Sequence, residues 1–241
     1  MRVLELAVDD LPTELDGLRI AHLSDFHLGV PSRGVKAVEK AVAWVTSRAP
    51  DLVCVTGDLL SRPGGKALLD DLLARLGHPY LVLGNHDFAL SRDPFSKPVQ
   101  LAEVSGGTLL SDESVDVDLR GVSVELAGVD PRTWLEAHGV DLPPGDARFR
   151  ILLCHFPSSL DVVDDGRFQL ILSGHLHAGQ IVLPYGFGRR LLLAHPRGRY
   201  SHGVYRRGRT TMHVSPGLGT TFVPFRYFAR PEATELVLRS R

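Results

Sequence analysis

Aspartate, asparagine and histidine residues gather in five short segments of this sequence. These segments are Asp25-x-His27, Gly57-Asp58, Gly84-Asn85-His86-Asp87, His155 and Gly174-His175-x-His177. Carboxylate, imidazole and amide oxygen ligands suit manganese, iron or zinc at five- or six-coordinate sites. Two such ions, ~3.5–4 Å apart, need a bridging carboxylate and can clamp the oxygens of a phosphoryl group. The residue types therefore predict a site for two divalent metal ions and phosphoryl-transfer chemistry.

The spacing within two of these segments indicates how their side chains would be presented. One residue separates Asp25 from His27, and one residue separates His175 from His177. Side chains two positions apart in an extended chain point to the same face. We therefore expect each pair to project to one side of an extended segment. A glycine stands at or before three of the five segments and should let the chain turn sharply where a ligand approaches the backbone.

Apolar runs precede the five segments and indicate the strands that must position them. The runs cover residues 19–24, 51–56, 79–83, 150–154 and 168–172. Between the first three, residues 34–48 and 67–76 have the apolar spacing of helices. This order is that of a βαβαβ unit, and open α/β sheets bind ligands at the carboxyl ends of their strands. Because buried polar groups without partners are costly, we expect the five segments to converge on a shared ligand.

The remaining chain favours a second sheet within the same domain. Residues 108–110, 115–119 and 122–129 have the pattern of short antiparallel strands. The last third is rich in glycine and proline and contains strand-like pieces at 211–214 and 234–238. We predict an α/β protein, a four-layer αββα sandwich in which two mixed β-sheets pack face to face with helices outside. We expect it to form one domain over residues 1–241.

The composition limits the partners and the location that we expect. The chain has 241 residues, of which 44% are hydrophobic and 23% charged, and its formal net charge is -1. No overall field therefore favours nucleic acid as an obligate partner. Cys54 and Cys154 lie in apolar runs and are expected to be reduced and packed. There is no signal-peptide pattern at the start and no apolar stretch near the ~20 residues that span a bilayer, which favours a cytoplasmic protein.

The five segments, in this order, resemble the motifs of the calcineurin-like metallophosphoesterases. The resemblance extends from Ser24 to about Gly219. Three longer stretches, LDGLRIAHLSDFHLG, GHLHAGQIVLP and SPGLGTTFVPFRYFARPE, look closest to the bacterial phosphodiesterase-like branch, which includes hydrolases of UDP-diacylglucosamine. Where that branch usually has GHTHGGQ, this chain has Leu176 and Ala178, and both histidines are kept.

The resemblance implies a role for each residue of the five segments. One metal ion would be bound by Asp25, His27 and His177, the other by Asn85, His155 and His175, and Asp58 would bridge them. The two divalent ions would be manganese, with iron or zinc as alternatives. A metal-bridging hydroxide would attack phosphorus in line, which makes Asp58 and His86 the catalytic residues. His86 would bind a phosphate oxygen or protonate the leaving group, and Asp87 would orient a neighbouring histidine.

One position departs from the family pattern. In the phosphatases of the family, an acidic residue three positions after the bridging aspartate supports the catalytic histidine. Here that position is Ser61, so His86 acts alone or with another partner.

Residues outside the five segments are candidates for substrate binding. Asp130 and Arg132 follow a strand-like run and could form a loop on the substrate side. Arg197 and Arg199 belong to the arginine-rich stretch 189–209, which is either an anion-binding rim or a solvated hairpin surface. For the aromatic segment TTFVPFRYF we expect core packing, with a lipid-facing edge as the alternative.

The favoured interpretation is a dinuclear metal-dependent phosphoesterase, either a phosphodiesterase or a pyrophosphatase. Its phosphoester substrate would be lipid-linked, which would bring the protein into peripheral contact with the inner face of a membrane. The alternatives are a nucleotide or nucleic-acid phosphodiesterase, a phosphomonoesterase and a non-catalytic scaffold of the same fold. Since no ligand position is missing, the scaffold is disfavoured.

Overall fold

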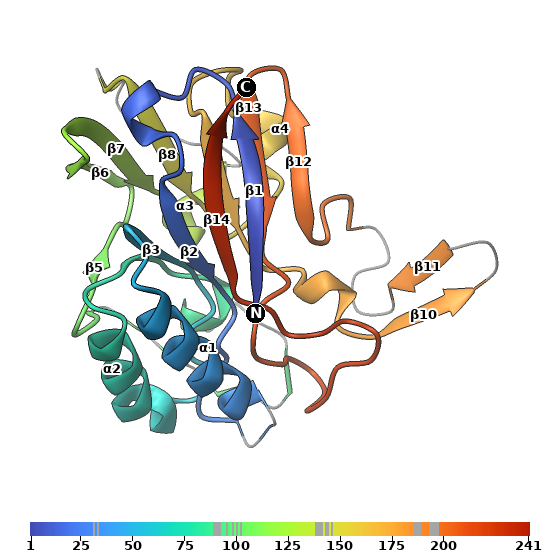
Figure 1. Ribbon diagram of the computed structural model, residues 1–241. Helices are drawn as coiled ribbons and strands as arrows, with labels where there is room; N and C mark the ends of the chain where they lie inside the picture. The colour runs from blue at the N-terminus through green and yellow to red at the C-terminus, as the bar shows by residue number, and fades with distance from the viewer. Residues whose placement is uncertain are drawn as a thin grey trace.

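The computed structural model describes residues 1–30, 32, 34–88, 93–94, 96–97, 99, 101, 103–137, 142, 145, 147–185, 189–192 and 198–241. Two six-stranded sheets form its centre (Figure 1). The first sheet has the order β1 (Arg2–Val8), β14 (Thr234–Ser240), β2 (Arg19–Leu23), β3 (Leu52–Thr56), β4 (Tyr80–Val82) and β5 (Thr108–Leu109). The second sheet has the order β12 (Gly203–Arg207), β13 (Thr210–Val214), β9 (Leu170–Ser173), β8 (Phe149–Leu153), β7 (Val122–Gly128) and β6 (Glu113–Leu119). A hairpin of β10 (Val182–Tyr185) and β11 (Arg189–Leu192) extends to one side (Figure 1).

Both sheets are mixed, as predicted. In the first sheet only β14 and β2 are antiparallel, and in the second sheet the pairs β12–β13 and β6–β7 are antiparallel. Parallel pairing aligns the carboxyl ends of β2, β3 and β4 in the first sheet and of β8 and β9 in the second. These five strands precede the five polar segments.

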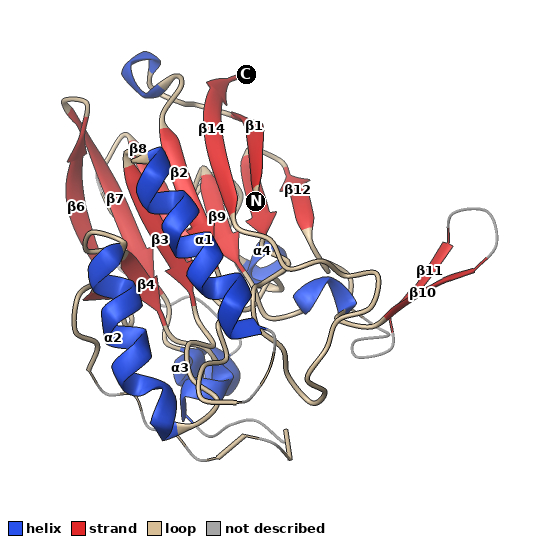
Figure 2. Cartoon of the chain, turned by 60° about the horizontal axis from the view of Figure 1, so that its bottom comes forward, coloured by secondary structure: helices blue, strands red, loops and turns tan. Residues whose placement is uncertain are grey.

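Helices cover the outer face of each sheet. Helices α1 (Gly34–Arg48) and α2 (Lys66–Arg75) lie side by side over the first sheet (Figure 2). The apolar residues of α1 recur every three or four positions, so Val38, Val42 and Val45 are buried on one side. Helices α3 (Pro131–Ala137) and α4 (Ser159–Val162) pack against the second sheet, and short 3₁₀ turns occur at Thr13–Leu15, Pro63–Gly65, Asn85–Phe88 and His177–Gly179.

Three apolar cores separate the four layers. The central core joins the sheets, with Ile20 and Leu236 from the first sheet and Ile151 from the second. One outer core lies between α1, α2 and the first sheet, and the other lies between α3, α4 and the second sheet. The predicted αββα sandwich is confirmed.

Several predicted strands need correction. Residues 108–110 were expected to pair antiparallel, but β5 runs parallel to β4 and extends the first sheet. The prediction holds for β6 and β7, which pair antiparallel. Strand β1 was not predicted, because it is an edge strand whose side chains are mostly exposed and whose apolar pattern is therefore weak. The expected loop at Asp130 and Arg132 instead enters helix α3 at Pro131.

Both cysteines are free and buried, as expected. Burial raises the pKa of the Cys154 thiol to about 12, so this thiol stays protonated. Within the part of the chain that the structure describes, no helix is long and apolar enough to cross a bilayer.

A buried histidine pair joins the two sheets near the carboxyl ends of their strands. His22 on β2 and His213 on β13 share a hydrogen bond of 2.8 Å between their Nδ1 atoms, and His22 Nε2 lies 2.9 Å from Thr56 Oγ1. Burial lowers the pKa of His213 to about 3, and burial together with His213 holds the pKa of His22 well below its usual value. Both rings are therefore neutral in the folded protein.

This pair makes the stability of the metal-free protein depend on pH. A histidine in the unfolded chain has a pKa of ~6.5, so below that pH the unfolded state binds protons that the folded pair does not. The free energy of unfolding should be fully retained above pH ~6.5 and fall as the pH drops toward the folded-state value for His213, about 3. His213→Gln should reduce this fall by up to ~1.4 kcal/mol per pH unit in urea unfolding. The same substitution at the exposed His78 should not, and an unchanged slope for His213→Gln would contradict the assignment.

Candidate metal centre

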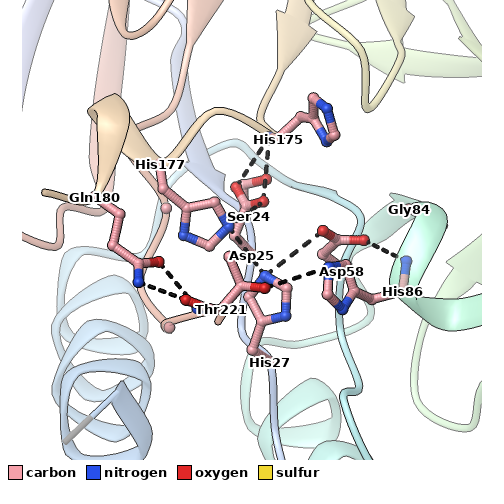
Figure 3. A network of polar contacts seen from close by, with 12 residues as sticks. Ser24, Asp25, His27, Asp58, Gly84, His86, His175, His177, Gln180 and Thr221 are labelled. Carbon is pink, nitrogen blue, oxygen red and sulfur yellow. Dashed lines mark hydrogen bonds and ion pairs between the residues drawn. The ribbon is translucent and has the colours of Figure 1, made fainter. Parts of the chain in front are cut away.

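The polar segments that follow β2, β3, β4, β8 and β9 meet at one edge of the sandwich. A first group consists of Asp25, His27, Asp58 and His177, all buried, and their side chains point toward one another (Figure 3). The Nε2 atoms of His27 and His177 lie 3.0 Å apart. Asp58 Oδ2 is 3.5 Å from His27 Nε2, and Asp25 Oδ1 is 3.3 Å from His177 Nε2. Four ligand atoms thus converge on one small volume.

A second group shares Asp58 with the first. It consists of Asp58, His155 and His175. His155 Nε2 lies 3.3 Å from Asp58 Oδ2 and 3.1 Å from His175 Nδ1. Asp58 is therefore the residue through which the two groups touch. Such a carboxylate has the position required to bridge two metal ions.

Asn85 lies in the chain between Gly84, which packs on Asp58, and His86, whose backbone N–H donates to Asp58. The Oδ1 atom of Asn85 is buried and accepts no hydrogen bond from the described part of the chain. A buried amide oxygen without a partner carries a cost that a bound cation would remove. Carboxylate, imidazole and amide donors in these positions fit divalent metal ions.

The backbone that presents these ligands is not extended, and that expectation is wrong. Five of the residues have left-handed φ values: 55° at Asp25, 48° at His27, 53° at Asp58, 76° at His175 and 51° at His177. Each such residue costs about 1–3 kcal/mol unless its surroundings impose it. Backbone hydrogen bonds help to impose it, since the Asp25 and His27 amides donate to Gly57 O and Asp58 O, both at 2.9 Å. The pairs converge through tight turns that follow the strands, not through strand alternation.

The second nitrogen of three histidines is held by a nearby group. His27 Nδ1 is 2.9 Å from Ser61 Oγ, and His155 Nδ1 is 2.8 Å from Thr56 O. These contacts orient the rings and leave both Nε2 atoms facing the centre.

The third histidine, His177, is held by the half-buried Arg226. Arg226 Nη2 lies 3.0 Å from His177 Nδ1. The contact orients the ring, whose Nε2 atom faces His27 and Asp25 in the centre.

The electrostatics of the centre favour ionised carboxylates. Burial alone would raise the pKa of Asp58, but His155 and His86 hold it well below its usual range. Burial would likewise raise the pKa of Asp25, but His177 lowers it, and the pKa of Asp25 lies below its usual value. Burial lowers the pKa of His27 and of His177, so these rings are neutral. Ionised carboxylates and neutral imidazoles are the forms that bind metal ions.

His155 and Asp87 are exceptions, because the pKa of each group is raised. Burial acts to lower the pKa of His155, but Asp58 raises it to about 9, so a metal ion would have to displace a proton there. Burial and Asp58 raise the pKa of Asp87 to about 7. Asp87 was expected to orient a histidine. Within the described part of the chain, Asp87 accepts hydrogen bonds from the backbone N–H groups of Leu59, Leu60 and Gly84, at 2.9–3.2 Å, and its role in orienting a histidine stays a prediction.

Residues missed in the sequence complete the surroundings of His86. Its backbone N–H donates to Asp58 Oδ1 at 2.9 Å, and its ring nitrogens contact Ser96 Oγ at 3.2 Å and Thr221 Oγ1 at 3.4 Å. Ser96 and Asp93 come from a loop without periodicity, which gave no signal. Thr221 and Arg226 lie in the stretch SPGLGTTFVPFRYFARPE, and that resemblance was the only available sign of them.

The candidate substrate-binding residues differ in their contacts and positions. Asp130 accepts two hydrogen bonds from the Arg132 guanidinium, at 2.8 and 3.0 Å, and Arg132 lies 4.1 Å above the Phe88 ring, next to the segment that carries His86. Arg199 pairs with Asp161 at 3.3 Å. Arg197 lies outside the described residues.

The described end of the arginine-rich stretch is paired within the chain. Arg206 bonds to Asp9 at 2.8 Å, and Arg209 lies 3.5 Å from Asp10. These contacts favour a hairpin surface over an anion-binding rim for this end of the stretch.

Gly84 allows the closest approach in the centre. A Cβ atom at this position would collide with Asp58 Oδ1 and lie 2.5 Å from the Asp58 nitrogen. Gly84→Ala should therefore displace Asp58, lower the metal content of the purified protein and destabilise the fold by about 1–3 kcal/mol. Metal analysis and urea unfolding would measure both effects. Gly64→Ala is the matched control, because a Cβ there meets nothing within 4 Å, and equal behaviour of the two variants would refute the prediction.

The chain is similar to several known proteins. Residues 18–179 match the family model of the calcineurin-like phosphoesterases. The metallophosphoesterase YkuE of Bacillus subtilis is 31% identical over 95% of this chain and 82% of its own length. A bovine transmembrane protein with a metallophosphoesterase domain is 33% identical over 98% of this chain, which spans 56% of that protein. The Haemophilus influenzae NAD nucleotidase structure superposes with a TM-score of 0.47 at 15% identity, covering 83% of this chain and 45% of that one.

The family match, together with the buried cluster of aspartate and histidine residues, identifies a metal-dependent phosphoester hydrolase. The chain belongs to the calcineurin-like phosphoesterase family.

Proposed function

We propose that this protein is a phosphodiesterase or pyrophosphatase that works with two divalent metal ions, with manganese as the first candidate. The observation that carries the proposal is the position of Asp58 within both ligand groups. One ion would be bound by Asp25, His27, Asp58 and His177, and the other by Asp58, Asn85, His155 and His175. When bound, the ions would activate water and neutralise charge on the phosphoryl oxygens.

The side chains of the chain itself supply positioning and proton transfer. Asp58 holds the two ligand groups together, and its Oδ1 atom also fixes the backbone of His86. The His86 ring, 94% buried beside His27, would donate a hydrogen bond to a phosphoryl oxygen or a proton to the leaving group. The side chains around them are buried, which limits the access of bulk water to the centre.

A reconstitution experiment tests this function. The protein is stripped of metal, loaded with Mn²⁺, and assayed with bis(4-nitrophenyl) phosphate and 4-nitrophenyl phosphate. We expect metal-dependent hydrolysis with a preference for the diester. Preference for the monoester would favour a phosphomonoesterase. Hydrolysis of neither compound, with two metal ions bound per chain, would overturn the proposal and favour the scaffold.

A lipid-linked substrate is favoured by an exposed aromatic loop. Phe222, Phe225, Tyr227 and Phe228 are 45–64% exposed, so the expected core packing of this segment is wrong. Thr221 of the same loop contacts His86, which joins the loop to the metal centre. Exposed aromatic side chains are typical of surfaces that meet the polar interface of a membrane. We therefore propose peripheral contact with the cytoplasmic face of a membrane.

Substrate comparison separates the lipid from the nucleic-acid alternative. A detergent-dispersed lipid-linked pyrophosphate and single-stranded DNA are offered to the manganese-loaded protein. Faster hydrolysis of the lipid, lost when Phe225 and Phe228 are both replaced by serine, supports the proposal. Faster hydrolysis of DNA favours a nucleic-acid phosphodiesterase.

Arg132 is a candidate for contact with a substrate phosphate, because it lies over Phe88 of the segment that carries His86. Asp130 clamps its guanidinium, Phe88 lies beneath it, and its side chain is 57% exposed. Arg132→Met should raise KM for a diester about ten-fold and change kcat less, because the charge contributes to binding throughout the reaction. Arg75→Met removes an exposed arginine on α2 and is the control. A KM unchanged by Arg132→Met would exclude the contact.

A further inference from the structure

The missing acidic partner of His86 has a counterpart elsewhere in the chain. Ser61, which stands where the phosphatases have an acidic residue, contacts His27 Nδ1 and so serves a different histidine. Asp93, seven residues after His86, is 94% buried and lies close to the His86 ring through two hydroxyl groups.

One oxygen of Asp93 gathers three donors. Asp93 Oδ2 accepts hydrogen bonds from Ser96 Oγ at 3.2 Å, Thr221 Oγ1 at 2.9 Å and the Phe222 backbone N–H at 3.0 Å. Asp93 therefore ties its own loop to the aromatic loop that contains Thr221.

Both loops are fixed in place around the ring. The Ser96 N–H donates to Asp93 O at 3.2 Å, and the Lys97 N–H donates to Ser61 O at 2.9 Å. On the other side, the Thr221 N–H donates to Gln180 Oε1 at 2.9 Å (Figure 3). Gln180 closes the segment that carries His175 and His177, so the position of Thr221 is set by the metal centre itself.

The direction of these hydrogen bonds determines which atoms of the two hydroxyl groups face the imidazole of His86. A carboxylate only accepts, so the hydroxyl hydrogens of Ser96 and Thr221 point to Asp93. Their oxygens lie beside the two ring nitrogens, Ser96 Oγ at 3.2 Å from Nδ1 and Thr221 Oγ1 at 3.4 Å from Nε2. The two hydroxyl groups thereby fix the orientation of the ring from both sides.

We propose that Asp93 is a positioning residue for His86, acting through the hydroxyl groups of Ser96 and Thr221 to hold the imidazole in a fixed orientation beside the metal centre. The inference rests on the proposed function. In that function His86 passes a proton to the leaving-group oxygen as its bond to phosphorus breaks. The attacking water forms the new P–O bond and releases one proton to solvent, and His86 regains a proton from solvent.

Leaving-group dependence tests this role, because a proton donor matters most when the leaving group is a poor one. The manganese-loaded protein and its Ser96→Ala variant are assayed with diphenyl phosphate, a poor leaving-group substrate, and with bis(4-nitrophenyl) phosphate, a good one. Ser96→Ala keeps the bonds from Thr221 and Phe222 to Asp93, so the loops stay tied. We expect kcat for diphenyl phosphate to fall at least about ten-fold more than kcat for the nitrophenyl diester.

Three further measurements separate positioning from a merely structural role. Ser96→Thr keeps the hydroxyl and should restore most of the lost turnover. Ser96→Ala should add little to His86→Asn, because both remove the same function. Like Ser96→Ala, Asp93→Asn should slow hydrolysis of diphenyl phosphate more than hydrolysis of the nitrophenyl diester. Its metal content should equal that of the wild-type protein.

The outcomes distinguish this inference from the function on which it rests. Equal slowing of both substrates by Ser96→Ala, or no slowing, would overturn the role of Asp93 while the wild-type protein remains a phosphodiesterase. If His86→Asn slowed the hydrolysis of both substrates equally, His86 would not be the proton donor, and this inference would fail as well. An inactive, fully loaded wild-type protein would overturn the proposed function as well.

Discussion

Replacing Asp58 by asparagine should empty the metal centre and abolish hydrolysis. Asp58 Oδ2 lies 3.5 Å from His27 Nε2 and 3.3 Å from His155 Nε2, so a single oxygen faces both ligand groups. Asparagine keeps an oxygen that can accept the His86 N–H but places an amide NH₂ group, or a neutral oxygen, where the anion was. The affinity for metal should fall by more than about 100-fold, beyond the 10–100-fold typical of groups that only support a ligand.

Metal content and calorimetric titration with Mn²⁺ would measure this loss, together with turnover of the diester. Asp71→Asn is the matched control, because Asp71 is an exposed aspartate on α2 whose partner is Arg75. We expect the control to bind two ions and to be fully active. An Asp58→Asn protein that binds two ions with wild-type affinity would refute the bridging role.

Replacing His86 by asparagine should slow turnover by about 10²–10⁴-fold and leave metal binding intact. The ring of His86 contacts Ser96 and Thr221 rather than a carboxylate of the centre, and its bond to Asp58 comes from the backbone N–H, which asparagine retains. The loss should therefore appear in kcat rather than in metal content. The two variants thus separate metal binding from proton transfer.

Steady-state kinetics and metal analysis on the same preparation would check this prediction. Loss of metal in His86→Asn would mean that the ring supports a ligand, for example through its contact with His27, whose ring centroid is 4.6 Å away. Wild-type turnover would remove His86 from the mechanism.

Much of the fold could be predicted because it follows from local periodicity. Helix α1 begins at Gly34 and ends at Arg48, as the apolar spacing indicated, and β3 and β8 lie within one residue of their predicted bounds. Strand β1 and the aromatic loop could not be predicted in this way. Apolar composition in residues 220–228 indicated burial, but four of its aromatic side chains are exposed, because exposure depends on neighbours distant in the sequence.

For the candidate site too, the features that depend on local sequence could be predicted and those that depend on distant contacts could not. The five ligand segments could be recognised because each follows a buried strand, and parallel strands bring their carboxyl ends together. The left-handed backbone of Asp25 and His177 could not, since the turn is imposed by contacts with other segments. Asp93 and Thr221 are 128 residues apart in the sequence. The network that joins them and Ser96 to His86 therefore forms only when the chain is folded.

Because the ligands come from both sheets, the metal centre can form only after the two sheets have docked. Asp25, His27 and Asp58 come from the first sheet, whereas His155, His175 and His177 come from the second, and His27 and His177 are 150 residues apart in the chain. Neither half of the sandwich can assemble the centre alone, so high-affinity metal capture must follow the docking of the halves. A bound ion then acts as a cross-link that closes a long loop, and it should retard the separation of the sheets more than the fraying of either one.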